Sequence, residues 1–116
     1  MDKKILAKQK INDSKVFNLL KKLGLKSSTM GIRYILCCVK FGVNSNEEIL
    51  NMEKIYLKIS KTYNVSPTTI RVSIKQSLDH RSMSLSKKNF ESVFGYDYNE
   101  DTFTNKEFIE EIIRIL

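Results

Sequence analysis

The chain has 116 residues, a net charge of +7 and 41% hydrophobic residues, which suits one globular domain with its own core. No apolar run is long enough for a membrane span or a signal peptide, so we expect a cytoplasmic protein. Cys37, Cys38 and the single histidine, His80, lack the spacing of a zinc site or of a catalytic Cys-His pair. We therefore expect both cysteines to be small core residues, and we expect no metal and no cofactor.

The positive charge is concentrated in two blocks. Residues 1–42 carry ten cations and two anions, residues 65–88 carry five and one, and residues 89–116 carry two and seven. If the two basic blocks lie on one surface, that surface attracts a polyanion such as DNA. The acidic C-terminal end would then face away from the DNA.

The first predicted elements are two helices. Residues 1–12 form a lysine-rich lead, which we expect to be frayed. The helical spacing of apolar residues predicts a first helix that is capped by Asp13 or Ser14 and stops at Gly24. A second helix is predicted over residues 30–41, ending at the next glycine.

A helix-turn-helix is predicted at the centre of the chain. A turn and short helix near residues 44–48 lead into an apolar-periodic helix that ends at Asn64. Ser66 and Pro67 are typical of a new helix start, because serine accepts from free first-turn amides and proline fits the first helical position. The second helix covers about residues 67–81. Such a pair binds DNA with its second, recognition helix in the major groove.

The predicted recognition helix has two faces at about 100° per residue. Its inward face carries Ile70, Ile74, Ser77, Leu78 and Arg81. Its outward side has the hydrogen-bonding and methyl groups that suit base edges, and the candidate base-reading residues are Thr68, Thr69, Arg71, Val72, Lys75 and Gln76. Candidate phosphate contacts are Lys58, Lys61, Ser66, Lys87 and Lys88. The alternative interpretation is an ordinary solvated helix face without a partner.

The remaining third of the chain is predicted to contain two helices. A serine-rich link over residues 81–88 leads to a short helix over 87–94, and residues 96–103 form an acidic, aromatic loop. A Thr-x-x-Glu capping box at Thr104 opens the final helix. Since no segment shows sustained period-two alternation, we predict an all-α bundle of about six helices, with residues 13–116 as a single helix-turn-helix domain.

Six ordered motifs run from the first helix to the end of the chain. They are Leu23-Gly24-Leu25, Gly31-x-x-Tyr34-Ile35, Ile59-x-Lys61-x-Tyr63-Asn64, Ile70-x-x-x-Ile74, Phe94-Gly95-Tyr96 and Thr104-Asn105-x-Glu107-Phe108-Ile109. Their order and spacing resemble the C-terminal DNA-binding effector domain of the stage-zero sporulation response regulator of endospore-forming Firmicutes. The resemblance implies a six-helix fold that binds promoter DNA as a homodimer or as tandem copies. It also implies contact with an RNA polymerase sigma factor through the region after the recognition helix.

Two features depart from the family pattern. The family usually carries an N-terminal receiver domain with a phosphoacceptor, and we expect none within this chain. Where the family presents Arg-hydrophobic-Glu-Arg, this chain has Thr69-Ile70-Arg71-Val72. The family's target sequence is therefore not carried over.

The sequence predicts a sequence-specific double-stranded DNA-binding regulator of transcription in sporulation, located at the nucleoid. The alternative is a protein-interaction module, an antagonist of a full-length regulator or of RNA polymerase that binds DNA weakly. Catalysis is not expected, because Glu110 and Glu111 face different ways on a helix and His80 has no nucleophile at recognisable spacing.

Overall fold

The computed structural model describes residues 12–45, 49–96 and 103–116. Within these residues the chain forms six helices and no strand, which confirms the all-α prediction. The helices are α2 (Asp13–Lys22), α3 (Met30–Asn44), α4 (Met52–Tyr63), α5 (Pro67–Asp79), α6 (Met83–Phe94) and α7 (Asn105–Ile115). Most of the predicted lead, most of the predicted turn and short helix near residues 44–48 and most of the predicted 96–103 loop lie outside the described residues.

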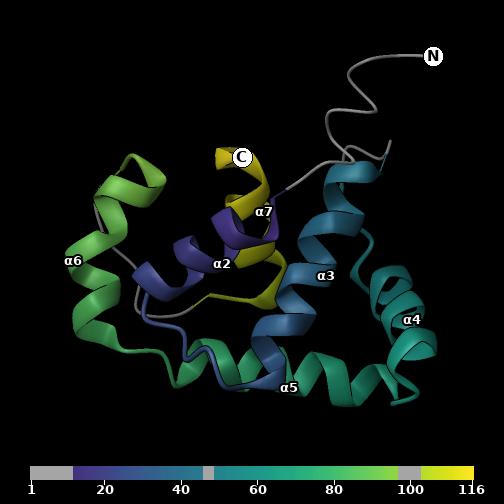
Figure 1. Cartoon of the computed structure of the whole chain (residues 1–116). Coiled ribbons are helices and arrows are strands. Elements are labelled where there is room, and N and C mark those ends of the chain that lie inside the picture. The colour runs from purple at the N-terminus through teal and green to yellow at the C-terminus, as the bar shows by residue number, and fades with distance from the viewer. Residues whose placement is uncertain (1–11, 46–48, 97–102) are drawn as a thin grey trace.

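The bundle is built on one side of α5. In Figure 1, α5 runs along the bottom of the molecule, α6 rises at its C-terminal end, and α3 rises from its middle with α4 beyond it. Helices α2 and α7 lie above α5 between α6 and α3. The core is made of apolar side chains from all six helices, among them Leu20, Ile35, Ile59, Ile70, Ile74, Phe90 and Phe108. One face of α5 is thus buried under the bundle, and its opposite face is left outside.

The first helix begins one residue earlier than predicted. The side chain of Asn12 caps it, accepting hydrogen bonds from the amides of Ser14 at 2.9 Å and Lys15 at 3.4 Å. The predicted cap at Asp13 or Ser14 was wrong, because asparagine makes the same capping bond and precedes both. The predicted stop is confirmed at Gly24, whose φ is +94°.

The second helix continues past its predicted stop. α3 runs through Gly42 to Asn44, three residues beyond the predicted range of 30–41. A Cβ on Gly42 would lie 2.4 Å from Cδ1 of Ile113 in α7. This glycine therefore lets α7 approach α3 and does not end the helix.

The predicted serine-rich link was also wrong. The side chain of Ser82 accepts from the amide of Leu85 at 3.3 Å and so acts as the N-cap of α6, and the serines after it lie in the first turns of the helix. The predicted end of this helix is confirmed at Gly95, with φ +84°. The capping box of α7 is confirmed as well, because the Thr104 hydroxyl accepts from the amide of Glu107 and the Glu107 carboxylate accepts from the amide of Thr104.

Among the described residues, no helix is both long enough and apolar enough to cross a lipid bilayer.

Candidate nucleic-acid interface

The turn between α4 and α5 is fixed by the residues at its two ends. α4 ends at Tyr63, and Asn64 adopts a left-handed conformation with φ 56°, which asparagine tolerates better than most residues. The side chain of Ser66 accepts from the amide of Thr69 at 3.0 Å, and Pro67 occupies the first turn of α5. These contacts confirm the predicted helix boundary. α4 and α5 form a helix-turn-helix, and α5 stands in the place of its recognition helix.

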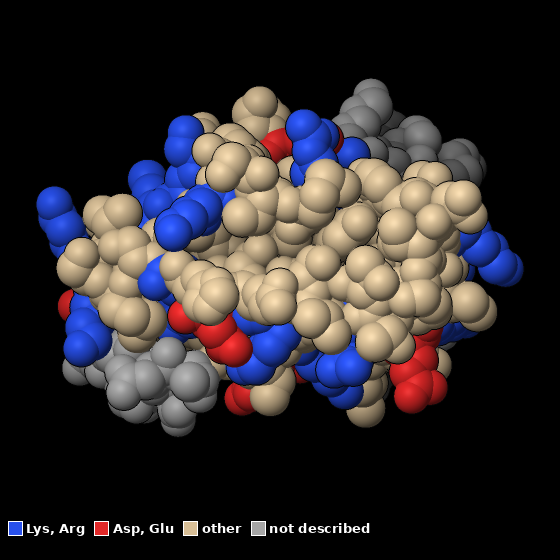
Figure 2. Space-filling view, turned by 90° about the horizontal axis from the view of Figure 1, so that it is seen from below, with Lys and Arg blue, Asp and Glu red and all other residues tan. Residues whose placement is uncertain are grey.

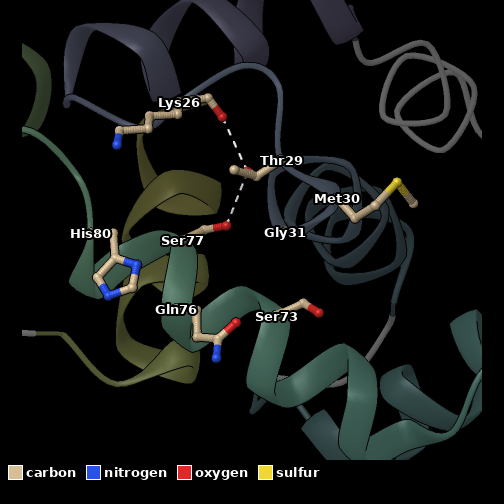
Figure 3. Close-up of a pocket in the computed structure, with 8 residues that line it drawn as sticks. All are labelled: Lys26, Thr29, Met30, Gly31, Ser73, Gln76, Ser77 and His80. Atoms are coloured by element: carbon tan, nitrogen blue, oxygen red, sulfur yellow. Dashed lines mark hydrogen bonds between the residues drawn. The ribbon is translucent and has the colours of Figure 1, made fainter.

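Helix α3 holds α5 on one side. A Cβ on Gly31 would lie 1.9 Å from Oγ of Ser77 and 2.5 Å from the carbonyl oxygen of Ser73, so the two helices cross with no room for a side chain. Beside the crossing, the Ser77 and Thr29 hydroxyl oxygens lie 3.1 Å apart, and the Thr29 hydroxyl donates to the carbonyl of Lys26 (Figure 3). The start of α3 is therefore clamped onto the C-terminal half of α5.

Helix α7 holds α5 on the other side. The side-chain amide of Asn105 donates to the carbonyl of Arg71 in α5 and to the hydroxyl of Tyr56 in α4, both at 3.0 Å. Burial raises the pKa of Tyr56, and the hydrogen bond from Asn105 opposes this rise. One buried amide thus joins both helices of the helix-turn-helix to α7.

The C-terminal end of α5 is fixed by a buried arginine. The helix ends at Asp79, two residues before the predicted end, with the exposed His80 as its C-cap. Arg81 is only 4% exposed, as expected for an inward residue. Its guanidinium donates to the carbonyl of Leu78 at 2.7 Å and to the hydroxyl of Ser86 at 3.1 Å.

The outward side of α5 is open to solvent and largely uncharged at its centre. Five of the six predicted base-reading residues are exposed: Thr68, Thr69, Val72 and Gln76 lie on this side, and Arg71 lies at its margin. Val72 is 37% exposed although it is apolar. Figure 2, which views the α5 face from below, shows a broad uncharged middle with Lys and Arg, and some Asp and Glu, around its margins. We call the four residues Thr68, Thr69, Val72 and Gln76 the reading strip.

The two predicted cationic base readers lie at one margin of this strip. Arg71 and Lys75 line an open depression beside the start of α7. The Lys75 ammonium donates to the carbonyl of Phe103 at 3.0 Å and pairs with the Asp79 carboxylate at 3.1 Å. Two of the three donors of the Lys75 ammonium are therefore already engaged at this margin.

The predicted phosphate contacts are spread over three helices. Lys61 is exposed in the last turn of α4, near the exposed Ser66 at the start of α5. Lys87 and Lys88 are exposed on α6. The Lys58 ammonium lies 5.6 Å from the centre of the Phe41 ring and so leans towards α3. The five residues therefore lie in the second half of α4, at the N-cap of α5 and in α6.

A notch of about 250 Å³ beside α5 contains residues that sequence reasoning missed. It lies between the start of α3 and the C-terminal half of α5, and Lys26 and His80 stand on one side of it (Figure 3). The basic character of residues 1–42 pointed to this region, but only the folded chain shows which of those cations lies beside α5.

The predicted cysteine positions are partly confirmed. Cys38 is fully buried, and burial raises the pKa of its thiol, so it is an inert core residue. Cys37 is half-buried against the core, with Sγ 3.8 Å from the hydroxyl oxygen of Tyr63.

Comparison with known proteins assigns nearly the whole chain to one group. Residues 16–116 match the family described as sporulation initiation factor Spo0A C terminal. Comparison with curated proteins and with solved structures gave no significant match.

Proposed function

This chain belongs to the family of Spo0A C-terminal domains, which are DNA-binding effector domains of a sporulation transcription factor and not enzymes; we propose that it binds double-stranded DNA in a sequence-specific way. In this proposal α5 enters the major groove, and the protein acts as a transcriptional regulator at the nucleoid. We also propose that the protein chooses its promoters through this contact, and that it binds DNA as a homodimer or as tandem copies.

The observation that carries the proposal is the exposure of one complete side of a rigidly held helix. Gly31 and Asn105 fix α5 from opposite sides, and the bundle covers only its inner face. A helix in this position can enter a major groove without rearranging its support. The reading strip would contact base edges, and Arg71 would reach a base from the margin.

Cations around α5 would contact the phosphates on the two walls of the groove. Lys61 and the Ser66 hydroxyl would contact one strand near the start of α5, and Lys26 would do so beside its C-terminal half. Lys87 and Lys88 would extend the contact along the backbone. Such contacts set affinity and register without reading sequence, and salt weakens them.

The test is selection of duplexes from a random pool, followed by fluorescence anisotropy at several salt concentrations. Arg71→Ala should relax the preference at one or two base pairs and cost about 1–3 kcal/mol on the selected site. Lys61→Ala should weaken binding to all duplexes alike and reduce the salt slope by about one unit. Lys40→Ala is the matched control, because Lys40 is exposed towards the C-terminal end of α3 and pairs with Asp13. Uniform recovery of the pool, or binding that salt does not change, would contradict the proposal.

One surface favours a second candidate function, a protein contact. Leu85 on α6 is 42% exposed and lies close to the exposed Lys87 and Lys88. We propose this part of α6 as the contact for a sigma factor of RNA polymerase, or for the full-length regulator if the chain is an antagonist with weak DNA binding. Leu85→Ala should then weaken association with the polymerase and leave DNA affinity unchanged. Loss of both together, or of neither, would refute this assignment.

A further inference from the structure

The composition of the reading strip indicates which base pairs it selects. None of its four side chains, Thr68, Thr69, Val72 and Gln76, is ionisable, and the middle of the α5 face in Figure 2 is correspondingly uncharged. Guanine is most often recognised by an arginine or lysine that bonds its O6 and N7 atoms. No such group stands in the centre of this strip.

The nearest cations are held at its margin. The Lys75 ammonium is occupied by the Phe103 carbonyl at 3.0 Å and the Asp79 carboxylate at 3.1 Å. Arg71 lies on the same side, where its backbone carbonyl accepts from Asn105. Both residues therefore border the strip on the side of α7.

The remaining groups of the strip are methyl groups and one amide. The Thr69 hydroxyl oxygen lies 2.9 Å from the hydroxyl oxygen of Ser66 at the helix cap, and this contact does not use the methyl group of Thr69. Val72 adds two methyl groups at the centre of the strip. Gln76 lies at the lower rim of the notch in Figure 3, and its amide points away from the Thr29 and Ser77 pair.

These groups match one kind of base pair. The thymine methyl is the apolar feature of the major groove, and a glutamine amide can bond N6 and N7 of adenine at the same time. We infer that the reading strip selects A·T base pairs at the centre of the bound site, with Val72 and Thr69 against thymine methyl groups and Gln76 on adenine. This inference rests on the proposed DNA binding and specifies its target.

Base analogues test each contact on the selected duplex. Replacing a contacted thymine by uracil removes only the methyl group and should weaken binding about fourfold, which is what burial of one methyl-sized group is worth. Replacing the contacted adenine by 7-deazaadenine removes the N7 acceptor and should weaken binding through loss of the bond from Gln76. Anisotropy competition at fixed salt measures both effects.

Matched variants assign the effects to residues. At the thymine that Val72 contacts, Val72→Ala should reduce the loss of affinity caused by uracil, while a thymine contacted by Thr69 keeps its effect. Gln76→Ala should no longer distinguish adenine from 7-deazaadenine. Val43→Ala is the control for the valine change, because Val43 lies at the far end of α3 from α5, and this variant should keep the thymine preference. A selected site with G·C pairs at its centre, or equal binding of thymine and uracil duplexes by the parent protein, would overturn the inference while leaving DNA binding intact. A pool without enrichment would instead refute the proposed function, and the inference with it.

Discussion

Replacing Gly31 by alanine tests how α5 is supported. The new Cβ would lie 1.9 Å from the Ser77 hydroxyl oxygen and 2.5 Å from the Ser73 carbonyl oxygen. The hydroxyl can rotate away, but the carbonyl belongs to the backbone of α5. The start of α3 and the middle of α5 must therefore move apart.

The size of the effect follows from two opposing contributions. Overpacking at a closed contact costs about 1–3 kcal/mol, while alanine in place of glycine in a helix gains about 0.5–1 kcal/mol. The control is Gly42→Ala in the same helix, which gains the same helical preference but meets Cδ1 of Ile113, the movable end of a side chain. We expect Gly31→Ala to be less stable than Gly42→Ala by about 1–2 kcal/mol.

Urea denaturation followed by circular dichroism measures this difference, with equal m-values as the check that both variants unfold in the same way. Adding Ser77→Ala to Gly31→Ala removes the hydroxyl contact and leaves the one with the Ser73 carbonyl, so it should recover only part of the lost stability. A Gly31→Ala variant as stable as Gly42→Ala, or complete recovery by Ser77→Ala, would refute the reasoning.

Three other predictions concern the ends of helices. The hydrogen bond from the Thr104 amide lowers the pKa of Glu107, so its carboxylate stabilises the fold above about pH 4.5 and this contribution is lost as the pH falls through the lowered pKa. Glu107→Gln should be less stable than the parent at pH 7 and equally stable at pH 2 in thermal melts, and a gap that persists at pH 2 would contradict this. Asn64→Ala should cost about 1 kcal/mol and Asn64→Gly less, because φ is 56° there; equal losses in urea would count against the strain. Arg81→Met removes two buried hydrogen bonds and the contact with the Phe103 ring, and should cost about 2–4 kcal/mol; an unchanged urea midpoint would show that the buried guanidinium adds no stability.

Local signals in the sequence predicted most of the fold. The cap at Ser66, the capping box at Thr104 and the inward face of α5 depend on residues within one or two turns, and the structure confirms all three. The predicted helix bounds were wrong where a residue type can serve either of two structural roles. Gly42 has the sequence of a helix end, but its role is decided by Ile113, which follows far along the chain.

The candidate site was less predictable, because some of its side chains are positioned by contacts with residues far away in the sequence. The exposure of Val72 and Gln76 follows from helical periodicity and is confirmed. The position of Lys75 depends on a backbone carbonyl at Phe103, and a carbonyl carries no sequence signal. The place of Lys26 beside α5 depends likewise on how α3 crosses that helix.

The bond between Asn105 and Arg71 has a consequence for the order of folding. The two residues are 34 positions apart in sequence, and the same amide also binds Tyr56. During synthesis, both helices of the DNA-binding motif leave the ribosome before the residue that joins them to α7. An isolated α4–α5 pair would therefore lack a buried contact that the folded chain makes, and a nascent chain can form this contact only when α7 has emerged.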